Sequence, residues 1–184
     1  TGIAVDMEAL FGDSILDPNG CAYVGFTGAT GGVSAEQSVL SWSMNDYLPE
    51  PCMTDLNFTG LDAPGWSAVG SAAFEGSELV LTQAVSGQAG AAWWESTVSL
   101  RDGFEVEFDF VLDGSADGIA FVIQSEGLSA LGAGGSGLGY GTNGDSGITR
   151  SLAVQFDTFS FGVRSATPED HVAVHTQGVG ENSP

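Results

Sequence analysis

The chain has 184 residues and a net charge of −21, because 24 acidic residues stand against three arginines and no lysine. A surface of this sign repels nucleic acids and anionic membranes, so neither is expected as a partner. Hydrophobic residues make up 42% of the chain, enough for a packed core, and no stretch approaches the roughly 18 apolar residues that span a bilayer.

The first part of the chain predicts a short helix-like segment at Asp6–Phe11, a turn at Pro18-Asn19-Gly20 and a strand over Ala22–Thr27. A second strand follows, in which Leu40, Trp42 and Met44 share one face. The segment Asn45–Met53 is then expected to be a linker, because its two prolines cannot both donate to a sheet ladder.

After the linker, apolar and alternating runs predict further strands at Glu78–Gln83, Ala92–Leu100, Phe104–Phe110, Ile119–Ile123, Ser151–Phe156 and Val172–Thr176. In Phe104–Phe110 the apolar residues alternate with acidic ones, so one face of that strand meets water. The continuous apolar run Ile119–Ile123 indicates a strand covered on both faces. Short strands, tight turns and the lack of a long helical pattern favour an all-β, antiparallel β-sandwich.

The two cysteines, Cys21 and Cys52, are too few for a disulfide framework. One follows the turn at Gly20 and the other lies in the proline-rich linker. A single disulfide that holds the linker in an oxidising compartment is one interpretation. Two free thiols are the other.

Several motifs together resemble the L-type, legume-lectin-like family: ADGIAFVIQ at 116–124, a glycine-rich loop ending in GLGY at 137–140, SLAVQFDTF at 151–159 and HVAVHT at 171–176. The stretch AYVGFTGATGG at 22–32 with LSWS at 40–43 resembles the closing strands of that family, yet here it comes first. The resemblance implies a concanavalin A-like jelly roll. It also implies three parts: closing strands in 1–44, a linker in 45–53, and the beginning and centre of a module in 54–184.

This displaced order leaves three explanations open. The domain is circularly permuted, or the chain is a window cut from a tandem array, or neighbouring copies complete one another. By comparison with the family, strands are missing between the end of the chain and its beginning. Exposed sheet edges would then invite pairing with another chain.

The resemblance also implies a carbohydrate site formed by Asp117 and a backbone N–H of the glycine loop, at Gly135. The family's metal ligands fall here on Gln155, Asp157, the carbonyl of Phe159, Phe161, Thr167 (with Glu169 and Asp170 nearby) and His171. Gln155, Phe161 and Thr167 replace ligands that the family requires. Asp157 and His171 are therefore expected to be remnants of a metal site without a cation, and Ca²⁺ is the one cofactor to test.

Three functions follow, in order of preference. The first is a non-catalytic, extracellular or cell-surface module for carbohydrate binding, adhesion or assembly, whose partners are glycans or neighbouring copies of itself. The second is a structural repeat of a filament or giant adhesin whose sugar and metal site has decayed. The third is a jelly-roll glycoside hydrolase that uses acids such as Glu105, Glu107 and Asp109, but a solvated acidic face explains these residues as well.

Overall fold

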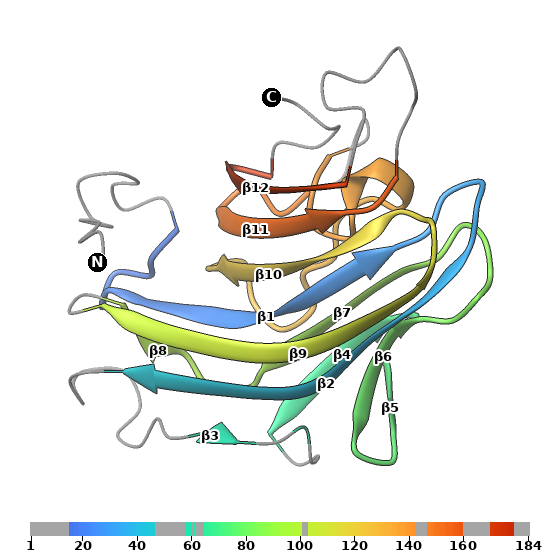
Figure 1. The fold of residues 1–184 in the computed structure, drawn as a ribbon. Coiled ribbons are helices and arrows are strands. Elements are labelled where there is room, and N and C mark those ends of the chain that lie inside the picture. The colour runs from blue at the N-terminus through green and yellow to red at the C-terminus, as the bar shows by residue number, and fades with distance from the viewer. Residues whose placement is uncertain are drawn as a thin grey trace.

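The computed structural model describes residues 15–46, 58–59, 61, 65–100, 103–142, 147–159 and 170–178. These residues form two antiparallel sheets, one seven-stranded and one five-stranded, which face each other as a sandwich (Figure 1). The all-β, antiparallel architecture predicted from the sequence is thereby confirmed.

The seven-stranded sheet has the order β12-β11-β10-β1-β7-β4, and β8 also pairs with β1. Its strands are β1 (Cys21–Ala29), β4 (Trp66–Gly70), β7 (Ala89–Trp94), β8 (Val98–Ser99), β10 (Gly118–Gln124), β11 (Ser151–Asp157) and β12 (His171–Thr176). In the five-stranded sheet β2 lies at the centre, paired with β9 on one side and with β3 and β6 on the other. Its strands are β2 (Ala35–Asp46), β3 (Phe58–Thr59), β5 (Ala73–Glu75), β6 (Glu78–Thr82) and β9 (Phe104–Gly114).

The first two strands of the chain occupy central positions in both sheets. β1 lies between β10 and β7, and β2 pairs with β9 from Ala35 to Asp46 (Figure 1). Residues that precede the expected linker are therefore built into the same sandwich as those that follow it. β2 continues through Asn45 and Asp46, the first two residues assigned to the linker, and 47–57 lie outside the described residues.

The core between the sheets is aromatic. Phe26 of β1 packs against Trp66 and Phe108, with ring centroids 6.1 and 5.0 Å apart, and Trp42 packs edge-on to Trp66 at 4.9 Å. A second buried cluster, which includes Trp93 and Tyr140, lies on the other side of the seven-stranded sheet. This sheet is consequently covered on both faces at its centre.

Two strand predictions are confirmed in detail. In β9 the residues Phe104, Val106, Phe108 and Phe110 pack against the core, while the acids between them are exposed. Every residue of β10 is buried, as the continuous apolar run indicated. In these two strands, the alternation of apolar and polar residues marks a strand covered on one face, and a continuous apolar run marks a strand covered on both.

Other strand predictions need correction. Leu40 does not share a face with Trp42, because a bulge in the pairing of β2 with β9 between Val39 and Ser41 turns Leu40 outward. Leu40 is 38% exposed, whereas Val39 is fully buried. The single strand expected over Ala92–Leu100 is divided into β7 and β8. The pairing of β7 with β1 ends at Trp93 and Gly25, and the pairing of β8 with β1 begins at Val98 and Ala22. The residues between these two pairs outnumber those on β1, so the ladder cannot run through.

Three strands, β3, β4 and β5, had no strand prediction. They are short, and β4 and β5 lie in a stretch rich in glycine, alanine and serine. The helix-like segment Asp6–Phe11 lies outside the described residues.

Candidate carbohydrate site

Asp117 lies in the turn that leads into β10, and its backbone is fixed on both sides. Its N–H donates to the Ala29 carbonyl of β1 at 2.9 Å, and its carbonyl accepts from the Thr158 N–H, just after β11, at 3.0 Å. The side chain of Gln37 adds a third tie from the opposite sheet, donating to the carbonyls of Ala29 and Ala116 at 3.0 and 2.7 Å. Contacts with β1, β2 and the residue after β11 thus set the position of Asp117.

Two glycines adjoin this carboxylate. A Cβ added to Gly31 would lie 2.9 Å from Asp117 Oδ2 and 3.4 Å from the Cα of Gly135, so the loop after β1, Asp117 and the glycine loop meet at one point. Gly135 begins the short 3-10 helix η2 (Gly135–Gly137) with φ +59°, a conformation that disfavours side chains. The structure therefore brings together Asp117 and Gly135, the two residues that the sequence assigned to carbohydrate.

The backbone N–H of Gly135 already has a partner. It donates to the Thr30 carbonyl at 3.2 Å, which anchors the glycine loop to the end of β1. A ligand that contacts this N–H must share or replace that bond. The contact predicted for Gly135 consequently depends on a small movement of the loop.

Burial changes the electrostatics of Asp117, which is only 3% exposed. Loss of solvation, and then repulsion by Asp157, raise the pKa of Asp117 to about 6, although a hydrogen bond from the Gly31 backbone acts in the opposite direction. Its Oδ2 atom is buried and has no hydrogen-bond partner within the described part of the chain. The carboxylate is therefore mostly ionised at neutral pH. One of its two oxygens has no hydrogen-bond donor among the described residues.

Asp157 stands across the β10–β11 ladder, opposite Gly118. Its Oδ1 accepts from the Phe159 N–H at 2.8 Å, and its Oδ2 is the second buried carboxylate oxygen that has no partner among the described residues. Burial raises the pKa of Asp157, while the Phe159 N–H and His171 oppose that rise. Two buried acids thus lie side by side at this end of the seven-stranded sheet.

A chain of hydrogen bonds between side chains lies beside the acids. The Tyr140 hydroxyl donates to Gln155 Oε1 at 2.6 Å, and Gln155 Nε2 lies 3.2 Å from His171 Nε2. In this contact the amide nitrogen is the donor and the ring nitrogen of His171 is the acceptor. Burial and the nearby Asp157 raise the pKa of Tyr140, so its hydroxyl keeps the proton that it donates.

This chain bears on the metal site that the resemblance implied. The resemblance assigns Gln155 to the position of a carboxylate ligand, and its amide makes a hydrogen bond to His171 Nε2. Within the described ranges, no three His, Cys, Asp or Glu side chains gather closely enough to hold a cation. Phe161, Thr167 and Glu169 lie outside those ranges. Among the described residues, the donors around Asp157 and His171 do not make up the metal centre that the resemblance implies.

Gln37, Gly31 and Tyr140 are site residues that sequence reasoning did not single out for a role. Tyr140 carried a signal, since it ends the GLGY motif. Gln37 carried none, because a glutamine in a strand gives no sign that it crosses to the opposite sheet.

Other predicted residues lie apart from this site or are only half described. Glu105, Glu107 and Asp109 are exposed on the outer face of the five-stranded sheet, whereas Asp117 belongs to the other sheet. Cys21 is disulfide-bonded. Cys52 lies outside the described residues, so the pairing of Cys21 with Cys52 stays a prediction.

Within the part of the chain that the structure describes, no helix has the length and apolar character needed to cross a bilayer. In a comparison of the sequence with protein families, the model of the legume lectin domain matches residues 53–182. The matched range contains Asp117, the glycine loop, Asp157 and His171, and it begins after β1 and β2. The chain belongs to the legume lectin domain family, whose members are non-catalytic carbohydrate-binding modules.

Proposed function

We propose that this protein binds carbohydrate at Asp117 as a non-catalytic module outside the cell. The observation that carries the proposal is the Asp117 carboxylate, whose buried Oδ2 has no donor among the described residues and lies beside two glycines. An unsatisfied buried acceptor is costly, and a ligand hydroxyl would remove that cost. The legume lectin family supports the same ligand class.

The chemistry suits a sugar. An ionised carboxylate accepts hydrogen bonds from hydroxyls, and such charge-assisted bonds are stronger than neutral ones. Gly31 and Gly135 carry no side chains, so a ring can approach the backbone closely at this point. Because the pKa of Asp117 is about 6, the accepting form predominates at neutral pH and is lost as the solution becomes more acidic.

We further propose that binding needs no metal ion. The support is the hydrogen bond between Gln155 and His171, two residues that the resemblance assigns to the metal site. In this proposal the backbone bonds of Asp117 to Ala29 and Thr158 hold Asp117 in place, and the Gln37 side chain fixes the neighbouring carbonyls of Ala29 and Ala116. The resemblance assigns this task to cations in other members of the family.

The test is a glycan array followed by calorimetry on the best ligand, with the wild type and Asp117→Asn. The variant keeps the shape of the side chain but loses the charge, so affinity should fall about tenfold or more, as expected for a hydrogen bond to a charged group. Asp109→Asn is the matched control, because Asp109 is exposed on the other sheet and accepts from Ser41 there.

Two further measurements sharpen this test. Affinity should decline as pH falls through about 6, and a chelator should leave it unchanged. Equal binding by wild type and Asp117→Asn, with both folded, would place the ligand elsewhere.

A second candidate is a structural module for adhesion or assembly that has lost its ligand. The engaged Gln155 amide favours it, because a former ligand position now serves the internal hydrogen-bond chain. A folded protein that binds no glycan on the array, with or without Ca²⁺, would support this function over the first.

A further inference from the structure

On the side of β12, the seven-stranded sheet extends further than the described strands of the five-stranded sheet. β9 lies beneath β10 and β11, because the ring of Phe108 contacts those of Phe121 and Phe156, at 6.3 and 5.7 Å between centroids. β12 continues the upper sheet beyond β11, but β9 pairs only with β2 among the described strands. Among the described residues, the long edge of β9 therefore has no partner strand beneath the overhanging β12.

The overhanging face is apolar. In the ladder between β11 and β12, Val172 stands opposite Phe156 and Val174 opposite Val154, so these valines continue the face that packs on the core. Val172 and Val174 are nevertheless 62% and 64% exposed, among the most exposed of the large hydrophobic residues that the structure describes. They have the orientation of core residues, but no other described strand lies beneath them.

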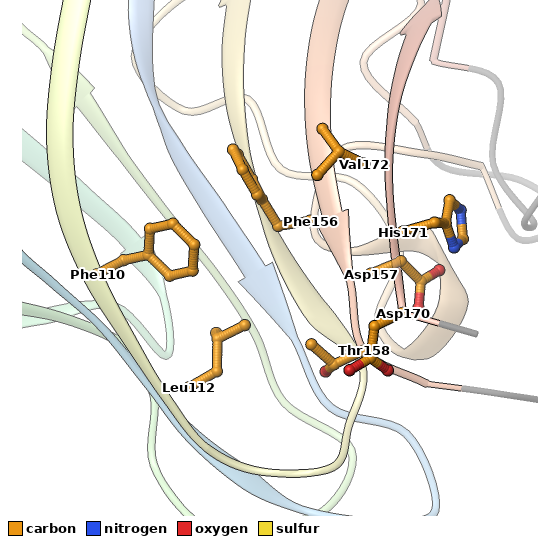
Figure 2. Close-up of a pocket in the computed structure, with 8 residues that line it drawn as sticks. All are labelled: Phe110, Leu112, Phe156, Asp157, Thr158, Asp170, His171 and Val172. Atoms are coloured by element: carbon orange, nitrogen blue, oxygen red, sulfur yellow. The ribbon is translucent and has the colours of Figure 1, made fainter.

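A groove of about 290 Å³ lies between the open edge of β9 and this overhang. Figure 2 shows Phe110 and Leu112 extending from β9 toward Phe156 and Val172, with Asp157, Asp170 and His171 at one end. Neighbouring strands lie about 4.8 Å apart and facing sheets about 10 Å apart. A strand added beside β9 would thus fall directly beneath β11 and β12 and fill the groove.

The chemistry of the edge specifies the occupant. An unpaired strand edge presents backbone donors and acceptors that match another extended segment. The core-facing side of that segment would be apolar, to cover Phe110, Leu112 and the valines. Its outer side would lie next to Glu105, Glu107 and Asp109, where opposite charges stabilise cross-strand pairs and like charges destabilise them.

We propose that the edge of β9 accepts an extended strand from a different polypeptide, in which apolar residues alternate with basic or uncharged polar ones. Charge argues against a second copy of this chain as the occupant. Each copy carries a net charge of −21, and antiparallel pairing of β9 with itself brings two rows of carboxylates together. The added strand completes the five-stranded sheet and covers Val172 and Val174.

The probe is a labelled synthetic peptide of about ten residues, the length of a long strand, that alternates valine with lysine and threonine. Fluorescence anisotropy should show saturable binding to the wild type that weakens with added salt. The same peptide with glutamate for lysine should bind about tenfold more weakly or worse, and a version N-methylated on alternate residues should not bind.

The protein variants test the location. The double variant Val172→Thr, Val174→Thr keeps shape and strand preference but makes the overhang polar, so affinity should fall about tenfold. Val33→Thr, Val85→Thr is the matched control, since Val33 and Val85 are exposed valines that do not line the groove, and it should bind like wild type.

Three results would overturn the proposal: no binding of the lysine peptide at millimolar concentration, equal binding of the glutamate peptide, or equal loss in the two double variants. Sedimentation of the protein alone provides a fourth. A dimer that the Val172→Thr, Val174→Thr variant abolishes would identify a second copy as the occupant.

Discussion

At Asp117 the stability of the fold and the proposed ligand binding are opposed. Its carboxylate is buried beside Asp157, and both effects disfavour the charged form. A hydroxyl ligand needs that charged form. The site therefore keeps an acid whose ionisation destabilises the empty fold, as binding sites often do.

The sign of this effect predicts the pH dependence of stability. Between pH 3.8 and about 6 the folded protein holds the Asp117 proton that the unfolded chain has released, so the contribution of Asp117 to stability falls as pH rises through this window. Above about 6 the full penalty, about 3 kcal/mol at most, is present. Asp117→Asn should thus raise the free energy of unfolding at neutral pH by about 1–3 kcal/mol.

Urea unfolding at neutral pH and near pH 4 measures this difference, and the gain should shrink at the lower pH. Asp109→Asn, an exposed control, should change stability little at either pH. A gain from Asp117→Asn that is equal at both pH values would mean that the charge of Asp117 is not its source.

At the residue scale the sequence predicted which residues meet but not how they bond. The ADG turn and the glycine loop were assigned to one site, and Gly31 links them in space. Gln155 was recognised only as a lost metal ligand. Its bonds to Tyr140 and His171 depend on the register of β11 with β12 and on the path of the glycine loop, which local sequence does not encode.

Strand prediction succeeded where one pattern controls the whole element. In β9 strict alternation places each phenylalanine against the core. In β2 the pattern failed at Leu40, because a bulge is a property of the pair of strands and the partner β9 comes much later in the chain. Period-2 patterning therefore predicts a face only as far as the next irregularity in the ladder.

The bulge can be tested by substitution on both sides of it. Val39→Ala removes fully buried methyl groups and should destabilise the protein by about 1–3 kcal/mol. Leu40→Ala should cost about 1 kcal/mol or less, whereas a leucine facing the core would cost about 2–5 kcal/mol. Chemical denaturation of the two variants beside the wild type compares them, and a larger loss at Leu40 than at Val39 would contradict the outward orientation of Leu40.

At the scale of the whole molecule, the order of strands along the chain differs from their order in space. The family match begins at residue 53, yet β1 and β2, which precede it, lie at the centre of the two sheets. We propose that a single chain closes its own sandwich in this permuted order. The sequence predicted the displaced block but left its closure open, because pairing within a chain and pairing between chains use the same strand patterns.

This proposal predicts that residues 47–184 alone do not fold cooperatively. Without β1 and β2, neither sheet keeps its central pairing, and the aromatic core loses Phe26 and Trp42, which pack against Phe108 and Trp66. Under reducing conditions the fragment should show no sharp thermal transition by circular dichroism. A peptide of residues 15–46 added in trans should restore the transition, since it supplies both strands.

Phe26→Ala in that peptide should weaken the complex by about 3–5 kcal/mol, because the ring fills the centre of the core. Glu36→Gln is the matched control, since Glu36 is exposed on β2 and its change should leave the complex intact. If the 47–184 fragment instead unfolds as sharply as the full chain, β1 and β2 are not needed for closure. Only a fold that depends on its first strands loses its cooperative transition when they are removed and recovers it when they return.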